Sequence, residues 1–366
     1  MKKIACITHS FHQKTKSAHL YPEEIFGKTD YSIDYYYVDD WSLHSVGLHE
    51  PIIGYDIVII VQLISLEILN KIQCDHIVFI PMYDFSCTWD AFKWFECTQI
   101  NILSPTKKIH DIACQMGLNS HYIQYYPAPA EYLPGDLKKV FLWQRINDIN
   151  INTVLQLLNP FPIDQIYLHH VPDPGHIAIE PSHEDILKYN ITISTWFENK
   201  NDYLDILDGA GIYMAPRLKE GGGSAFIDAM KKGKVVIAHN DGAMNDYITH
   251  NETGLLYDAH NPQALNVEPQ DFVRIQQNAY QSVLDGRVRW QKSIPQIIDF
   301  MYQKRPSISD QSLLAARNYR EMLRQEHDVL KQKLEHAEHI LQHDRWYNFG
   351  QLSHIEKMKK LFRILT

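Results

Sequence analysis

The sequence has no hydrophobic run that approaches the ~20 apolar residues needed to span a bilayer. Its first residues, MKKIACITHS, contain one short apolar run, which is too short for a signal peptide and fits a first buried strand. Cysteine is scarce, and its five scattered residues suit neither a disulfide framework nor a CxxC site. They are Cys6, Cys74, Cys87, Cys97 and Cys114. We therefore expect reduced thiols in a cytoplasmic protein that is soluble or peripheral to a membrane.

Basic charge is not in excess either, since 35 Lys and Arg against 44 Asp and Glu give a formal net charge of −9. Affinity for a nucleic-acid backbone rests mainly on Lys and Arg, so this balance argues against a nucleic-acid partner. Two places are rich in histidine, His169-His170 and His336/His339/His343, but no Cys or carboxylate pattern completes a metal site there. The sequence also lacks a Walker phosphate loop and a hydrolase triad motif. We expect no bound metal.

What the sequence does contain is a series of short apolar segments. KIACITH, YSIDYYYV, YDIVIIV and HIVFIPM occur in the first third, and KKVFLWQR, DQIYLHHV, NITISTWF, GIYMAP and VVIAH follow a proline-rich stretch, QYYPAPAEYLPGDLKK. Continuous apolar strands are typical of parallel sheets buried on both faces, and the proline-rich stretch is typical of a linker. We predict an α/β protein with two Rossmann-like domains, residues 1–136 and 137–303, that face each other across a cleft, and a helical extension over 304–366.

The extension is predicted to be amphipathic. Apolar side chains recur at heptad spacing in Leu323, Leu330, Leu334, Ala337 and Leu341. A helix over 308–346 would thus present a coiled-coil seam for a homo-oligomer, with packing on the body of the protein as the alternative. The final HIEKMKKLFRILT is basic and apolar, which suits peripheral contact with an anionic membrane surface or, alternatively, docking on the protein itself.

The most informative stretch lies between residues 215 and 258, where two carboxylates, Glu220 and Asp228, flank a glycine triplet. GIYMAP precedes this triplet, and FIDAMKKG after it has the spacing of a helix that ends at Gly233. The glycines permit close backbone approach to a ligand, and the first N–H groups of the helix point toward it. We therefore predict a cradle for phosphate and sugar oxygens.

Together with the following AMKKGKVVIAHNDGAMNDYI and TGLLYD, the pair Glu220-x7-Asp228 resembles the acidic-pair motif of retaining, nucleotide-sugar-dependent glycosyltransferases of group 1, also called family 4. The family pattern has glutamate at both ends, so Asp228 is one methylene shorter. The resemblance is clear over residues 137–303. It implies the GT-B fold, in which the first domain holds an acceptor, the second holds a UDP- or GDP-sugar, and the closing helix returns toward the first domain. It also implies a metal-independent reaction without a cofactor and without an enzymic nucleophile.

The resemblance further implies roles for individual residues. Arg145, at the end of VFLWQ, would clamp phosphate, with an ion pair between the domains as the alternative. The family adds a lysine a few residues later, which INDININT lacks, and the nearest substitutes are Arg217 and Lys219. Glu220 would accept hydrogen bonds from hexose hydroxyls and Asp228 from ribose hydroxyls, with helix capping as the alternative. The N–H groups near the sugar and the phosphates would be those of Gly222, Gly223 and Ser224.

Other loops that follow strands are also candidates, because ligands bind beyond the carboxyl ends of strands in open α/β sheets. Residues 195–197 would lie beside the base, unless Trp196 and Phe197 belong to the core, and residues 240–242 would border the diphosphate. In the first domain, Asp84 and His9 are candidates to orient or deprotonate an acceptor hydroxyl, with an ordinary turn role as the alternative.

These expectations describe a retaining hexosyltransferase that acts on a glycan or lipid-linked acceptor during surface polysaccharide synthesis, at the inner face of a membrane. Two alternatives remain open at this point. A nucleotide-sugar epimerase of the same fold would turn over the donor alone. A non-catalytic assembly partner would retain the fold without transfer.

Overall fold

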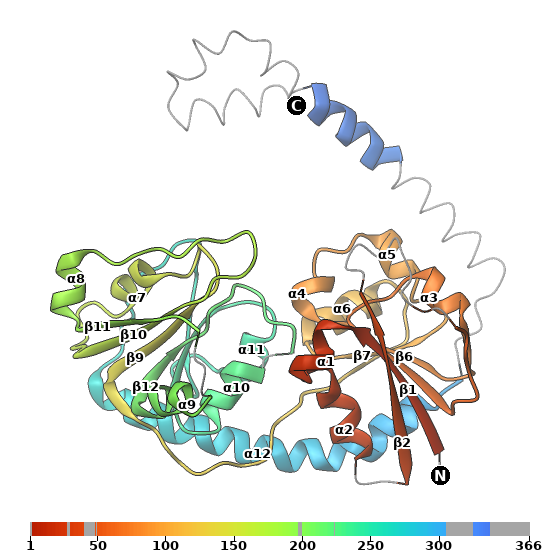
Figure 1. The fold of residues 1–366 in the computed structure, drawn as a ribbon, viewed down its shortest axis with the longest axis horizontal. Helices are drawn as coiled ribbons and strands as arrows, with labels where there is room; N and C mark the ends of the chain where they lie inside the picture. Colours follow the sequence, from red (N-terminus) through yellow and green to blue (C-terminus); the bar gives the residue numbers. More distant parts are fainter. Residues whose placement is uncertain are drawn as a thin grey trace. The chain divides into compact units, whose positions relative to one another are not determined.

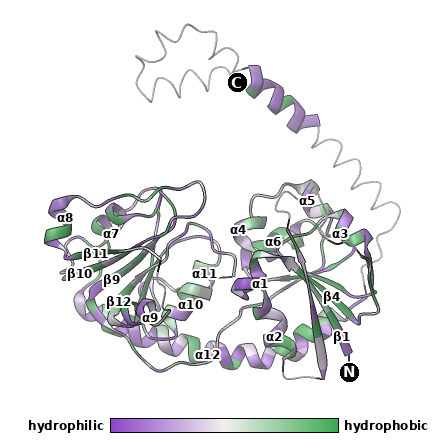
Figure 2. Ribbon diagram, viewed as in Figure 1, coloured by the Kyte–Doolittle hydropathy of each residue, from purple (hydrophilic) through white to green (hydrophobic). Residues whose placement is uncertain are grey.

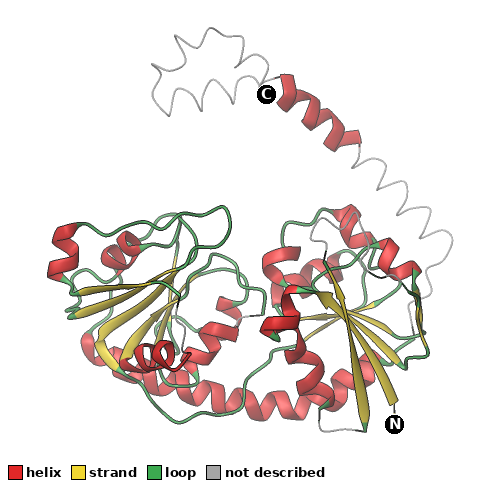
Figure 3. Cartoon of the chain, in the orientation of Figure 1, coloured by secondary structure: helices red, strands yellow, loops and turns green. Residues whose placement is uncertain are grey.

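The computed structural model divides into two compact units, Met1–Pro306 and Ser307–Thr366. The first unit contains two lobes, and each lobe has a six-stranded parallel sheet with helices around it (Figure 1; Figure 3). The residues described are 2–27, 30–39, 48, 50–196, 200–222, 224–304 and 325–336.

The N-terminal lobe has the strand order β2-β1-β4-β6-β7-β8. Its strands are β1 Lys2–His9, β2 Tyr31–Val38, β4 Ile57–Val61, β6 Ile77–Ile80, β7 Asn101–Ser104 and β8 Ser120–Tyr122, with a separate pair, β3 Ile52–Ile53 and β5 Ile72–Gln73. Its helices are α1 Phe11–Thr15, η1 Ser17–His19, α2 Leu20–Phe26, α3 Leu66–Asn70, α4 Tyr83–Ser86, α5 Ala91–Phe95 and α6 Lys107–Gln115. Every residue of β4 and β6 is buried, which explains why these segments are apolar without alternation, and Figure 2 shows β4 as hydrophobic.

The C-terminal lobe has the strand order β11-β10-β9-β12-β13-β14. Its strands are β9 Asp136–Gln144, β10 Gln165–His170, β11 Ile191–Ser194, β12 Ala210–Met214, β13 Val235–His239 and β14 Leu255–Tyr257. Its helices are α7 Ile151–Leu157, α8 His183–Lys188, α9 Lys200–Gly209, α10 Ser224–Met230 and α11 Met244–Tyr247. The chain moves from β9 outward to β11 and then returns to the other side of β9 as β12. The order therefore reverses between β9 and β12, and a crevice for ligands is expected at the carboxyl ends of these two strands.

The last helix of the unit, α12 (Pro269–Met301), runs along both lobes (Figure 1). Its first part contributes Phe272 and Ile275 to a core cluster of the C-terminal lobe. Its last part contributes Trp290 and Ile297 to a core cluster of the N-terminal lobe. The predicted return of the closing helix to the first domain is therefore found, and this fold confirms the predicted pair of Rossmann-like domains.

In the second unit, the structure describes a helix over residues 325–336. The apolar side chains of Leu330 and Leu334 are exposed on it. The remaining positions of the predicted coiled coil and the basic tail lie outside the described residues. Within the described ranges, none of the helices combines the length and the apolar character required to cross a membrane.

Candidate active site

The carboxyl ends of the two sheets meet around Tyr83, which follows β6. The Tyr83 backbone N–H donates to the Gly221 carbonyl at 3.2 Å, and the Tyr83 hydroxyl donates to the Asp241 carboxylate at 2.9 Å. Gly221 follows β12 and Asp241 follows β13, so both belong to the C-terminal lobe. The predicted loops of the two lobes thus lie in direct contact beyond the carboxyl ends of β12 and β13.

Two arginines that follow β9 and β12 converge on a single carboxylate. Arg145, directly after β9, donates from Nε and Nη2 to Oδ1 of Asp173 at 2.9 and 2.6 Å. Arg217, after β12, donates from Nη2 to Oδ2 of Asp173 at 2.6 Å. The structure therefore brings Arg145 together with Arg217, one of the two residues named as substitutes for the missing family lysine. Because Asp173 belongs to the same lobe as both arginines, this ion pair is not the interdomain pair named as the alternative for Arg145.

Asp173 was not predicted as a site residue. It lies in the loop after β10, the strand that pairs with β9 in parallel. The rule that selected the other loops, polar residues beyond the carboxyl end of a strand, also applies to it. The PDPG sequence around Asp173 is equally typical of an ordinary turn, so the sequence did not single out Asp173 as a site residue.

Glu220 lies in the loop between β12 and α10 and is partly buried. Burial raises the pKa of Glu220 to about 7; nearby Arg217 opposes this rise and nearby Asp84 adds to it. The Glu220 carboxylate therefore lies near both a positive charge, on Arg217, and a negative charge, on Asp84. At this place it can accept hydrogen bonds. Lys219, beside it, is also partly buried.

Gly221 and Gly222 lie where side chains of the N-terminal lobe approach the loop closely. A Cβ on Gly221 would come within 2.7 Å of Oδ1 of Asp84, and one on Gly222 within 2.9 Å of the Tyr21 hydroxyl. Part of the glycine triplet therefore makes room for the opposite lobe, a role that the sequence did not reveal. Gly223 lies outside the described residues, and Ser224 begins α10.

Buried polar atoms with no hydrogen-bond partner among the described residues surround this loop. They are Oδ1 of Asp84, Nε of Arg217 and the hydroxyl of Tyr21. Burial raises the pKa of Asp84, and the nearby Arg217, whose Nη1 lies 3.7 Å from Oδ2 of Asp84, opposes the rise. Buried polar groups normally have partners, so such a group of atoms marks a place where a polar ligand can bind. Tyr21 was also missed, because nothing in its local sequence places its hydroxyl near Gly222.

Asp228 differs from Glu220 in its surroundings. It lies on α10, its side chain is 52% exposed, and its Oδ1 pairs with Nζ of Lys231 at 2.5 Å. The two members of the acidic pair therefore occupy an inner and an outer position of the same loop and helix. The ribose role of Asp228 stays a prediction.

An aromatic cluster consists of Trp143 of β9, His169 of β10 and Tyr203 of α9. The ring centroids of Trp143 and His169 are 5.1 Å apart, and the Arg145 guanidinium lies 4.7 Å from the Trp143 ring. Burial lowers the pKa of His169 to about 4, so its ring is neutral near pH 7. The alternative that Trp196 belongs to the core is wrong, since its side chain is 75% exposed. Phe197 lies outside the described residues.

In the N-terminal lobe, the strand order reverses between β1 and β4, and polar residues lie beyond both ends. Gln62, directly after β4, has a left-handed backbone with φ 70°, which is uncommon for a residue other than glycine. Its Oε1 lies 2.9 Å from Nε2 of His12. His9, at the end of β1, is buried, and its Nδ1 accepts from the Phe11 N–H at 2.9 Å. That bond fits the turn role named as the alternative for His9, and the role of His9 toward an acceptor hydroxyl stays a prediction.

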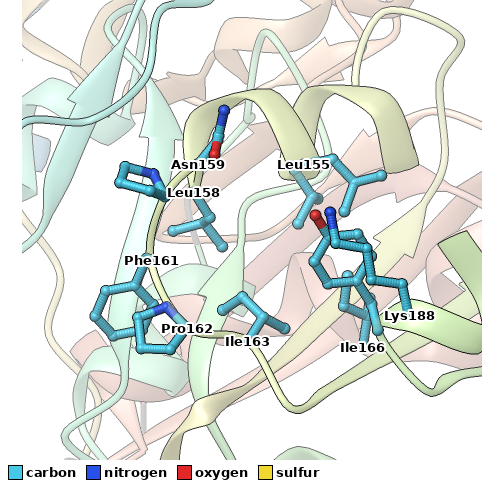
Figure 4. A pocket seen from close by; sticks show the side chains of 11 residues that line it. Leu155, Leu158, Asn159, Phe161, Pro162, Ile163, Ile166 and Lys188 are labelled. Carbon is cyan, nitrogen blue, oxygen red and sulfur yellow. The ribbon is translucent and has the colours of Figure 1, made fainter.

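One cavity, of about 270 Å³, lies away from this site (Figure 4). Its wall includes Ile166, near the start of β10, and Tyr189, just before β11. These residues are at the amino ends of the strands, whereas Arg145 and Glu220 follow carboxyl ends. Across the residues that the structure covers, no cluster of three or more His, Cys, Asp or Glu residues is arranged to hold a metal ion.

Comparisons with known proteins agree with this fold. Residues 182–302 match the family of glycosyl transferases group 1. Among solved structures, sucrose-phosphate synthase of Thermosynechococcus elongatus has a TM-score of 0.57 at 15% identity, covering 82% of this chain and 100% of that chain. HepE of Anabaena in complex with UDP has a TM-score of 0.58 at 11% identity over the same shares of the two chains.

A glycosyltransferase of Rickettsia africae has a TM-score of 0.56 at 10% identity, covering 83% of this chain and 99% of that chain. No curated protein matches the sequence. At these identities the solved structures establish the fold, and the family match indicates glycosyl transfer. The chain thus has the GT-B fold, and its residues 182–302 are similar to glycosyl transferases group 1.

Proposed function

We propose that this protein is a retaining, metal-independent glycosyltransferase that moves a hexose from a UDP- or GDP-sugar to an acceptor hydroxyl. One observation carries the proposal. The guanidinium groups of Arg145 and Arg217 meet at one carboxylate beside Glu220, at the point where the strand order of the C-terminal lobe reverses. Two guanidinium groups are suited to a diphosphate, which they bind through paired N–H donors.

Each part of the donor has a candidate partner around this point. The diphosphate lies against Arg145 and Arg217, and Lys219 adds positive charge to the same loop. The hexose hydroxyls donate to Glu220, and the N–H groups of Gly222, Gly223 and Ser224 face the sugar and phosphate oxygens. The ribose diol donates to Asp228. The aromatic cluster of Trp143, His169 and Tyr203 offers flat, largely apolar surface for the base.

The reaction proceeds by departure and attack on the same face of the sugar. The bond between the anomeric carbon and the diphosphate oxygen breaks, and negative charge develops on the leaving group, where the arginines stabilise it. The acceptor oxygen forms a bond to the anomeric carbon, and its proton passes to an oxygen of the leaving phosphate. Asp84 orients the acceptor hydroxyl from the N-terminal lobe. Contact between the lobes excludes water, which limits hydrolysis of the donor.

The donor class is supported by HepE, which has been solved with UDP and, separately, with UDP-glucose. The acceptor belongs to a glycan or a lipid-linked glycan that is extended during surface polysaccharide synthesis. The enzyme works in the cytoplasm and meets the membrane peripherally through its basic tail, while the helix predicted over 308–346 joins copies of the chain.

The test is calorimetry with UDP and GDP, followed by product analysis with the matching labelled nucleotide sugars. We expect one nucleoside diphosphate to bind, with the affinity reduced about tenfold or more by Arg145→Gln. Transfer of label to an added glycan or lipid acceptor, with the anomeric configuration kept, supports the proposal. Conversion of the donor without an acceptor would indicate an epimerase. Absence of binding to either nucleotide would indicate a non-catalytic partner.

A further inference from the structure

Asp173 uses both of its carboxylate oxygens on the two arginines that the proposed function gives to the diphosphate. Oδ1 accepts from Nε and Nη2 of Arg145, and Oδ2 accepts from Nη2 of Arg217. The Nε and Nη2 edge of a guanidinium is a fork that binds one oxyanion group at a time. The carboxylate therefore takes the same N–H donors that a diphosphate requires.

The loop that carries Asp173 is held by its backbone and not by this carboxylate. The Asp173 N–H donates to the Arg145 carbonyl at 2.8 Å, and the His176 N–H donates to the Asp173 carbonyl at 3.0 Å. Further along, the Ile177 N–H donates to Oδ1 of Asn147 at 2.9 Å. The Asp173 side chain can thus turn to another staggered rotamer while its loop stays attached to the β9 loop.

We infer that Asp173 competes with the diphosphate for Arg145 and Arg217, and thereby limits the affinity of the enzyme for the nucleoside diphosphate. The inference rests on the proposed function. Asp173 acts through the arginines and is a positioning residue. Its negative charge weakens binding of the donor and also of the nucleoside diphosphate product. Since product release limits turnover in many enzymes, this competition keeps the product from remaining on the arginines.

The experiment compares Asp173→Asn with the wild type and with Asp164→Asn. Asparagine keeps the size of the side chain and removes its charge. Asp164 pairs with Lys138 just before β10, at the opposite end of the strand, so its replacement removes the same charge from the same lobe outside the site. We expect Asp173→Asn to bind UDP or GDP about tenfold more tightly by calorimetry, with slower dissociation in stopped flow, and Asp164→Asn to bind as the wild type does.

If Asp173 only held the two arginines in place, its replacement would give the opposite result. The arginines would be misplaced and would bind a diphosphate more weakly. Unchanged or weaker binding by Asp173→Asn overturns the inference, and Asp173→Ser, which also lacks the charge, should move in the same direction as Asp173→Asn. The proposed function fails separately, if Arg145→Gln and Arg217→Gln bind the nucleotide as tightly as the wild type. In steady state, the inference expects a lower donor KM for Asp173→Asn together with a lower kcat, owing to slower product release.

Discussion

The Tyr83 hydroxyl of the N-terminal lobe donates a hydrogen bond to the Asp241 carboxylate of the C-terminal lobe at 2.9 Å. Lys108 pairs with the other oxygen of Asp241 at 2.7 Å. Burial alone would raise the pKa of Asp241, but the hydrogen bonds from Lys108, the Gly242 N–H and Tyr83 hold it below its ordinary value. The Tyr83 ring also lies against Gly242, where a Cβ would come within 2.4 Å of the ring. Tyr83 therefore joins the two lobes beside the candidate donor site.

Replacing Tyr83 by phenylalanine should loosen this contact while keeping the ring on Gly242. We expect the free energy of unfolding to fall by about 0.5–1.5 kcal/mol, the usual worth of one hydrogen bond. We also expect a donor KM several times higher, because contact between the lobes holds the donor in place. Steady-state kinetics and denaturant unfolding measure both effects. Tyr36→Phe is the matched control. The Tyr36 hydroxyl forms a hydrogen bond with the Tyr55 hydroxyl, which belongs to the same lobe. Equal donor KM values for the two variants would show that the Tyr83 contact does not act on the donor.

Most strands of the two large sheets could be predicted because each lies in a local apolar segment, whereas β7, β8 and β14 were not predicted. Residues 235–239, VVIAH, form β13 with every residue buried, and the GIYMAP segment contains β12. Continuous burial leaves a signal in the sequence itself, whereas the order of strands does not. The family resemblance implied the two Rossmann-like domains, and the structure supplied the strand order.

The candidate site was predictable only in part, for the same physical reason. Glu220 and Arg145 stand in motifs and could be found from their neighbours in the sequence. Asp173 and Tyr21 act through residues far away in the chain: Asp173 through Arg217, and Tyr21 through its approach to Gly222. Contacts of this kind follow from packing and have no local pattern.

Glu220→Gln should nearly abolish transfer while the protein remains folded. The amide keeps the size of the side chain but has one oxygen fewer to accept hydrogen bonds from sugar hydroxyls, and it lacks the negative charge. We expect kcat/KM to fall at least about a hundredfold, as for other preorganised electrostatic groups in active sites. Glu252→Gln, in an exposed turn, is the control and should keep full activity. A Glu220→Gln enzyme with normal kcat/KM would remove the central role given to this carboxylate.

The raised pKa of Glu220 also predicts how stability depends on pH. Its pKa is about 7 in the folded protein against an ordinary value of 4.5, so the folded state binds more protons between these values. The stabilising contribution is complete below the ordinary pKa and is lost as pH rises through the folded pKa. Thermal unfolding from about pH 4 to about pH 8 should therefore show the wild type losing stability relative to Glu220→Gln as pH rises. A constant difference between the two melting temperatures would mean that Glu220 keeps an ordinary pKa.

Asp228→Asn should weaken donor binding about tenfold with little change in kcat at saturating donor, because the ribose does not change during the reaction. The carboxylate pairs with Lys231 and is 52% exposed, and such surface pairs contribute little to stability. Lys231→Gln is the matched control, since it breaks the same ion pair and leaves the carboxylate in place. Calorimetry with the nucleoside diphosphate distinguishes the two variants. Similar affinities for both would assign the effect to the ion pair and not to the ribose.

A chain that ends after Pro306 should bind the nucleoside diphosphate as the full chain does. Residues 1–306 form a compact unit of their own, and Arg145, Arg217, Glu220 and Asp228 all lie within it. Removing residues 307–366 takes away the predicted oligomer seam and the basic tail, so light scattering should report a smaller particle, and flotation with anionic vesicles should report less bound protein. If the shortened chain binds nucleotide normally but keeps its size and its vesicle binding, the seam and the membrane contact must instead be formed by the first unit. If it is folded but no longer binds nucleotide, the donor site depends on residues beyond Pro306, contrary to the site described above.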